Sequence, residues 1–97
     1  MNKGYWVVAY RTVVDLATVK NYAALLAVTL EKFGARMLVS PTSVVTTHEG
    51  GLQQMTVVVE FDNYETALAA YDSDDHKKAL AALGSSVERD FRIAEGA

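Results

Sequence analysis

Two segments of this chain carry apolar side chains on both faces of a β-strand, and this limits the folds that the chain can adopt. Residues 4–13 read GYWVVAYRTV, and residues 52–61 read LQQMTVVVEF. Both are rich in the aromatic and β-branched residues that are typical of strands. An antiparallel sheet with one face in water normally alternates apolar and polar residues instead. A sheet built from these segments therefore needs a cover on each face.

The helices expected from the sequence can cover only one of those faces. Residues 15–34 predict a helix, with Asp15 as its N-cap and Gly34 at its end. A second helix, over residues 62–80, is expected to break at Ser73, because this serine is suited to cap a new helix. The apolar stripe of the first helix contains Val19, Tyr22, Ala23, Leu26, Leu30 and Phe33.

Two further strands, over residues 35–51 and 87–96, complete the order strand, helix, strand, strand, helix, strand. This is the ferredoxin-like order, an α+β fold with both helices on one face of a four-stranded antiparallel sheet. The other face would expose a larger apolar patch than monomers usually do. We therefore expect a homodimer in which two open sheet faces pack together as a barrel. The whole chain, residues 1–97, is expected to be one domain.

The amino-acid composition of the chain excludes several classes of function. Nine basic and twelve acidic residues give a net charge of -3, whereas a protein that binds a nucleic-acid backbone needs a basic face. There is no cysteine, and neither histidine is spaced with carboxylates as in a metal site, so we expect no metal and no cofactor. The longest apolar stretch is too short to span a membrane and no signal-peptide pattern is present, which favours a cytoplasmic protein.

Five segments together are similar to one known group of small bacterial proteins. They are GYW at 4–6, FGARMLV at 33–39, EG at 49–50, VVVEFDNYETALAAYDSDDHKKAL at 57–80 and IAEG at 93–96. The chain resembles, over essentially its whole length, the domain-of-unknown-function family thirteen-thirty within the dimeric α+β barrel superfamily. The resemblance implies a ferredoxin-like homodimer. It implies no particular activity, because the family has no settled one.

The chain departs from the family pattern at three places. Residues 40–42 read Ser-Pro-Thr where the family usually has Arg-Gly-Gly, and Leu83 stands where an arginine is often found. His76 stands where a tyrosine usually follows the break in the second helix. Arg36 occupies its matching position. The chain has thus lost two cationic groups of the family and gained a titratable ring.

His76 is the main candidate for catalysis. The preceding Asp74 and Asp75 are adjacent in a helix, so their side chains diverge and do not form a metal site with it. The ring either lies on the surface at the helix start or faces a pocket, as a general base or a hydrogen-bond donor. The superfamily includes a plant polyketide cyclase that uses a tyrosine and a histidine after its second helix. This implies that Tyr71 orients a carbonyl while His76 removes a proton; Tyr71 is otherwise a core aromatic.

Four other residues are candidates for ligand binding: Trp6, Tyr10, Arg36 and His48. Trp6 and Tyr10 are core or interface residues that could line a cavity. Arg36 is either a substrate clamp or an ion-pair group, and His48 lies either at the barrel mouth or in an exposed turn. The sequence thus favours a dimeric barrel that binds a small molecule, as a cofactor-free cyclase, isomerase or oxygenase acting on an apolar carbonyl-bearing metabolite. The alternatives are a non-catalytic ligand-binding protein and a purely structural homodimer.

Overall fold

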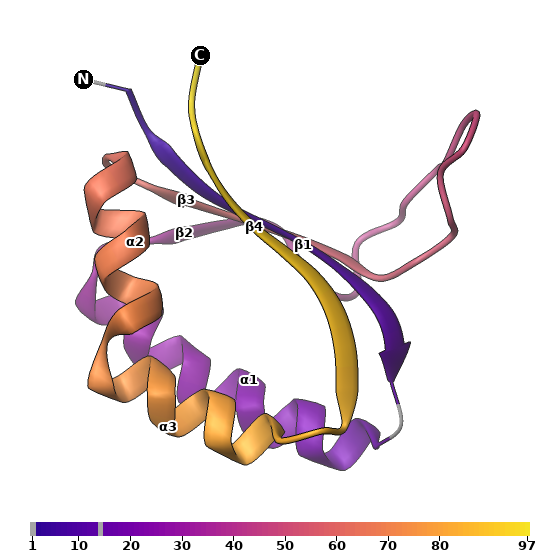
Figure 1. The fold of residues 1–97 in the computed structure, drawn as a ribbon, viewed down its shortest axis with the longest axis horizontal. Coiled ribbons are helices and arrows are strands. Elements are labelled where there is room, and N and C mark those ends of the chain that lie inside the picture. The colour runs from indigo at the N-terminus through magenta and orange to yellow at the C-terminus, as the bar shows by residue number, and fades with distance from the viewer. Residues whose placement is uncertain (1, 14) are drawn as a thin grey trace.

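The computed structural model describes residues 2–13 and 15–97, and its elements follow the expected order (Figure 1). They are β1 (Gly4–Val13), α1 (Leu16–Lys32), β2 (Arg36–Val39), β3 (Thr56–Phe61), α2 (Tyr64–Asp72), α3 (Asp74–Leu83) and β4 (Val87–Glu95). The expected domain, residues 1–97, also includes Met1 and Val14, which lie outside the described residues.

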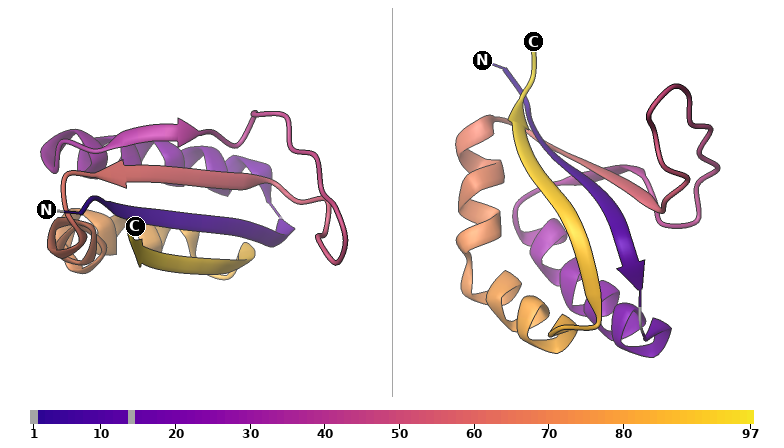
Figure 2. Two further views of the ribbon diagram at one scale, coloured as in Figure 1. Left: turned by 90° about the horizontal axis from the view of Figure 1, so that it is seen from above. Right: turned by 45° about the vertical axis from the view of Figure 1, so that its right-hand side comes forward.

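The four strands form one antiparallel sheet in the order β2-β3-β1-β4. All three helices lie on the same side of this curved sheet, and α1 and α3 run next to each other across it (Figures 1 and 2). The ferredoxin-like α+β architecture expected from the sequence is therefore confirmed. Among the described residues, no helix is both long enough and apolar enough to cross a membrane.

The two apolar sides of β1 and β3 have different surroundings. The side that faces the helices is buried and carries Trp6, Val8, Tyr10, Val57, Val59 and Phe61. On the opposite side, Val7 is 38% exposed and its cross-strand partner Val58 is half-buried. No helix of the described chain covers that side (Figure 1). The core therefore lies between sheet and helices, and an apolar sheet face is left open.

Helix caps fix the positions of the residues that follow them. Asp15 accepts a hydrogen bond from the backbone of Ala17 and begins α1, as expected. Ser73 separates α2 from α3, and its Oγ accepts a hydrogen bond of 3.2 Å from the backbone nitrogen of His76. His76 is thus the third residue of α3, and the cap holds its backbone in place.

The beginning of β1 packs closely against the beginning of α2. A Cβ atom on Gly4 would lie 2.5 Å from the carbonyl oxygen of Asn63, so only glycine permits this approach. Two residues further on, the indole nitrogen of Trp6 donates a 2.9 Å hydrogen bond to the carbonyl oxygen of Ala67. These contacts fix Trp6 beneath α2 as part of the core.

The second strand is much shorter than the sequence suggests. A strand was expected over residues 35–51, but β2 ends at Val39, and residues 40–55 form a loop that projects away from the helices (Figure 2). Pro41 has no backbone N–H for a ladder. Next to it, Ser40 and Ser43 exchange hydrogen bonds in a local turn. The turn diverts the chain from the sheet although its apolar pattern continues.

Candidate functional site

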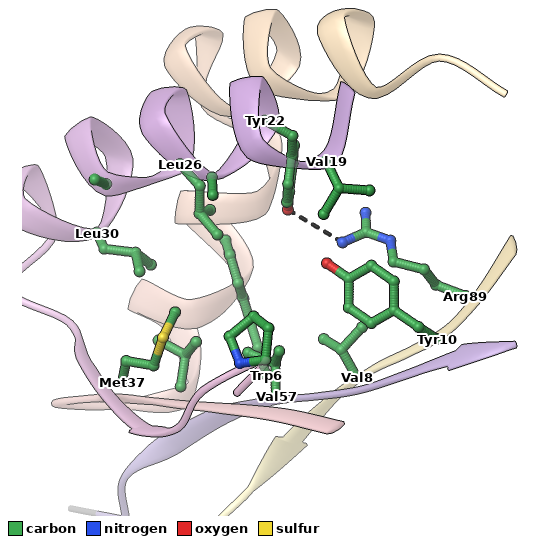
Figure 3. A pocket seen from close by; sticks show the side chains of 14 residues that line it. Trp6, Val8, Tyr10, Val19, Tyr22, Leu26, Leu30, Met37, Val57 and Arg89 are labelled. Carbon is green, nitrogen blue, oxygen red and sulfur yellow. Dashed lines mark hydrogen bonds between the residues drawn. The ribbon is translucent and has the colours of Figure 1, made fainter. Parts of the chain in front are cut away.

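An apolar cavity of about 260 Å³ lies between α1 and the helix-facing side of the sheet (Figure 3). Its aliphatic walls include Val8, Val19, Leu26, Leu30, Val57 and Val59. Three residues with polar groups, Tyr10, Tyr22 and Arg89, also line it, and their polar groups gather at one end (Figure 3). An apolar hollow with a few convergent polar groups is the usual form of a small-molecule site.

The polar end is assembled from three elements. Tyr22 comes from α1, whereas Tyr10 of β1 and Arg89 of β4 are direct partners across the two paired strands. The guanidinium carbon of Arg89 lies 5.0 Å from the ring centre of Tyr22, 5.5 Å from that of Tyr10 and 5.1 Å from that of Phe91. The cation is therefore held among three aromatic rings at the end of the cavity.

A chain of polar contacts leads from this end into the core. Arg89 Nη1 donates to Tyr22 Oη at 3.1 Å, and Tyr22 Oη lies 3.4 Å from His76 Nε2. His76 Nδ1 lies 2.9 Å from the backbone carbonyl oxygen of Tyr71. Because a carbonyl oxygen only accepts, Nδ1 carries the proton and Nε2 is left to accept from the Tyr22 hydroxyl. Tyr22 is thus placed to pass a proton from the cavity to His76.

The His76 ring is fully buried behind the cavity wall, with the rings of Trp6 and Tyr71 each 4.9 Å away. Burial holds the pKa of His76 below its usual value of 6.5; the hydrogen bond to Tyr71 opposes this shift and the charge of Arg89 adds to it. Burial also raises the pKa of Tyr22, against the opposing charge of Arg89. Near neutral pH the pair is therefore a neutral imidazole beside a protonated phenol.

This burial predicts a pH-dependent stability. Because His76 has a lower pKa in the folded chain than in the unfolded one, the unfolded state binds more protons as the pH falls below about 6.5. The free energy of unfolding, measured with urea, should therefore drop between about pH 7 and pH 5 by more in the wild type than in His76→Gln. His48 is exposed in the 40–55 loop and offers a matched control. The His48→Gln variant should keep the pH dependence of unfolding that the wild type shows. Equal pH dependence in the wild type and His76→Gln would contradict the assignment.

The predicted site residues are placed as follows. Trp6 and Tyr10 line the cavity. His76 stands behind Tyr22 and is not itself a lining residue of the cavity. Tyr71 contacts His76 through its backbone carbonyl and through its ring, whereas its hydroxyl was expected to orient a substrate. The structure thus brings the expected pair together, with Tyr22 between His76 and the cavity.

The other two candidates lie elsewhere. Arg36, on β2, forms ion pairs with Glu60 at 2.9 Å and with Asp62 at 3.2 Å. His48 is exposed in the 40–55 loop. Neither lines the cavity, and their roles in ligand binding stay predictions.

Sequence reasoning missed Tyr22 and Arg89 as functional candidates. Tyr22 falls within the apolar stripe of the first helix and therefore looks like an ordinary core residue. Arg89 did carry a signal, because it shares a strand face with the apolar Val87, Phe91 and Ile93. A cation at an inward position of a strand requires a partner inside the protein, and this requirement could have marked it.

The rest of the described surface has fewer groups suited to binding a ligand or a metal. A second hollow of about 230 Å³ lies on the open sheet face, lined in part by Val7, Thr56 and Arg92. The guanidinium of Arg92 is already paired with Asp90 at 3.0 Å. Within residues 2–13 and 15–97, no group of three or more His, Cys, Asp or Glu side chains is placed to hold a metal ion. The cavity beneath α1 is therefore the candidate site.

Fold and cavity together define a ferredoxin-like α+β protein with an apolar pocket between sheet and helices. Several solved structures are similar to the chain in fold. A protein of unknown function from Rhodopseudomonas palustris has a TM-score of 0.72 at 7% identity, over 99% of this chain and 83% of that one. A dimeric ferredoxin-like protein of unknown function from Bacteroides fragilis gives 0.65 at 16% identity, over 96% and 95%. A proposed antibiotic biosynthesis monooxygenase from Caulobacter crescentus gives 0.59 at 16% identity, over 99% and 92%.

The chain belongs to the family described as Domain of unknown function (DUF1330), whose model matches residues 3–97. This confirms the resemblance found in the sequence. No curated protein matches the chain.

Proposed function

We propose that the chain works in the cytoplasm as a homodimeric barrel that binds a small, apolar, carbonyl-bearing metabolite in the cavity beneath α1. There it acts without a cofactor, as a cyclase, isomerase or oxygenase. The observation that carries this proposal is the contact chain Tyr22–His76–Tyr71 at the polar end of an otherwise apolar cavity. The proposed monooxygenase from Caulobacter crescentus shares the fold. This similarity supports a general class of enzyme and no particular reaction.

The three reaction types share a first step that the site is suited to perform. Each begins when a proton leaves the carbon next to a carbonyl group or leaves an enol oxygen. The Tyr22 oxygen would take this proton while its own proton passes to His76 Nε2, and the substrate would keep the electron pair as an enolate. The hydrogen bond from His76 Nδ1 to the Tyr71 carbonyl holds the ring in the required tautomer. The 3.4 Å contact of Tyr22 with His76 is long, as catalytic hydrogen bonds often are before a ligand binds.

The open sheet face supports the homodimer. Val39, Val58 and Val7 are successive cross-strand neighbours and form an apolar row on that face. Ion pairs border the row: Arg36 and Glu60 lie beside it, and Arg92, which pairs with Asp90, is the cross-strand neighbour of Val7 at its end. An apolar strip bordered by both signs of charge suits a twofold interface between copies. The ferredoxin-like proteins from Bacteroides fragilis and Thermobifida fusca are described as dimeric.

A non-catalytic ligand carrier is the second candidate. It is favoured by one observation: His76 is separated from the cavity by Tyr22 rather than exposed to it. A carrier and an enzyme would use the same cavity, and they differ in whether the contact chain moves a proton.

Ligand binding can be measured with the single tryptophan, because Trp6 lines the cavity. We expect benzylideneacetone, a small apolar ketone, to change Trp6 fluorescence in a saturable way. Ala23 lines the cavity from α1 at its exposed mouth, so Ala23→Phe should obstruct it and weaken binding by about tenfold or more. The neighbouring Ala24 is also exposed but is not a lining residue, which makes Ala24→Phe the matched control. Equal binding by both variants would contradict the assignment of the cavity.

A further inference from the structure

Among the residues that the structure describes, Arg89 is the arginine without an acidic partner. Of the four arginines, Arg11 and Arg92 pair with Asp90, and Arg36 pairs with Glu60 and Asp62. Within residues 2–13 and 15–97, no carboxylate lies within 4.0 Å of the Arg89 guanidinium. Its charge is therefore not balanced by the chain.

The surroundings of Arg89 raise the free-energy cost of leaving its charge without an opposite charge. The side chain is partly buried, with its guanidinium among the rings of Tyr10, Tyr22 and Phe91. A guanidinium has five N–H donors, and the protein partners of Arg89 are two phenol oxygens, those of Tyr22 and Tyr10, neither of which carries a charge. Removing a charge from water costs free energy unless an opposite charge compensates for it. Aromatic rings compensate only in part.

The chain's acidic groups near Arg89 in sequence cannot supply that charge. Glu88 and Asp90 flank it on β4, and successive side chains of a strand point to opposite faces. Asp90 is held on the open face by Arg11 and Arg92. The cavity, which Arg89 lines, is where a counter-charge carried by a ligand can reach it.

We propose that the natural ligand of the cavity is an apolar carboxylic acid that binds as its anion, with its carboxylate against the Arg89 guanidinium. The hydroxyls of Tyr10 and Tyr22 point toward the same end of the cavity and border this position (Figure 3). The apolar part of the ligand occupies the space beside Leu26 and Leu30. This inference rests on the proposed function, and it narrows the metabolite to an organic acid.

The single positive charge of Arg89 and the planar, forked shape of its guanidinium determine which kind of anion fits beside it. One guanidinium offers two parallel N–H groups that match the two oxygens of a carboxylate. A phosphate ester carries more charge and would call for additional donors, whereas the other lining residues are mainly aliphatic or aromatic. The site therefore fits a planar monoanion better than a phosphorylated compound.

Three compounds of nearly equal shape test the proposal: cinnamate, cinnamamide and benzylideneacetone, which place an ionised, an amide and a methyl ketone group at the same position. Trp6 fluorescence gives the dissociation constant for each. We expect the wild type to bind cinnamate at least about tenfold more tightly than either neutral compound. Arg89→Met should bring the three constants within about threefold of one another. Arg11→Met removes an equal charge from an ion-paired site outside the cavity and should leave the preference unchanged.

The outcomes separate this proposal from the proposed function. Equal binding of all three compounds by the wild type would overturn the carboxylate proposal and leave the ligand cavity standing. No binding of any of them would overturn both. If Arg89→Met does not fold, Arg89→Gln replaces it, and the comparison of the three compounds on the wild type needs no variant.

Thermal unfolding without ligand gives a second readout. A ligand-binding role predicts that Arg89→Met melts no lower than the wild type, and a large decrease in Tm would indicate a structural cation instead.

Discussion

Val58→Asp is expected to disrupt the proposed homodimer and leave a dissociated or unfolded chain. Val58 lies at the centre of the apolar row on the open sheet face, between Val39 and Val7. In a face-to-face dimer, twofold symmetry would bury two new carboxylates without partners. The penalty is several kcal/mol for each, which is comparable to the whole stability of a small domain. Sedimentation velocity at micromolar concentration should show a mass of two chains for the wild type and loss of that species for the variant.

A surface position on the other side of the molecule gives the control. Val28 of α1 is 54% exposed, so Val28→Asp adds the same charge on the helical side, away from the open sheet face. It should remain dimeric and fully folded. A wild-type protein that sediments as a single folded chain would contradict the dimer, and so would a Val58→Asp variant that stays dimeric.

The architecture of the fold follows from local patterns that the sequence displays. Strand and helix periods, with caps at Asp15 and Ser73, predict the order of elements and the break between α2 and α3. Apolar residues on both sides of β1 and β3 predict an open apolar face, which the structure has. The extent of the strand over residues 35–51 was wrong, because apolar pattern alone does not show whether the backbone of that segment finds a ladder partner.

The candidate site depends on contacts between distant parts of the chain, and local patterns do not report these. The hydroxyl of Tyr22 meets His76 from 54 positions away in the sequence, and Arg89 reaches Tyr22 across 67. A helix-opening histidine could equally have faced water. What buries His76 is the packing of α3 beside α1, together with the rings of Trp6, Tyr71 and Phe91.

Tyr22→Phe and His76→Gln are each expected to abolish most of the proposed proton transfer. Both side chains lie on one relay, so loss of either interrupts it, and general-base catalysis typically contributes about a hundredfold or more in rate. The double variant should be no slower than either single variant, because residues that act as a unit are not additive. Tyr71→Phe should retain most activity, since its backbone carbonyl, not its hydroxyl, holds His76.

Deuterium exchange of benzylideneacetone in D₂O tests this relay without knowledge of the natural substrate. The methyl protons next to the carbonyl exchange only when the ketone loses a proton and regains a deuteron, and proton NMR follows their loss. We expect the exchange rate to be proportional to the concentration of the wild-type protein, and to stay close to the uncatalysed rate with Tyr22→Phe or His76→Gln. If the wild type binds the ketone but exchanges its protons no faster than buffer, the protein is a carrier, and the catalytic role of Tyr22 and His76 is contradicted.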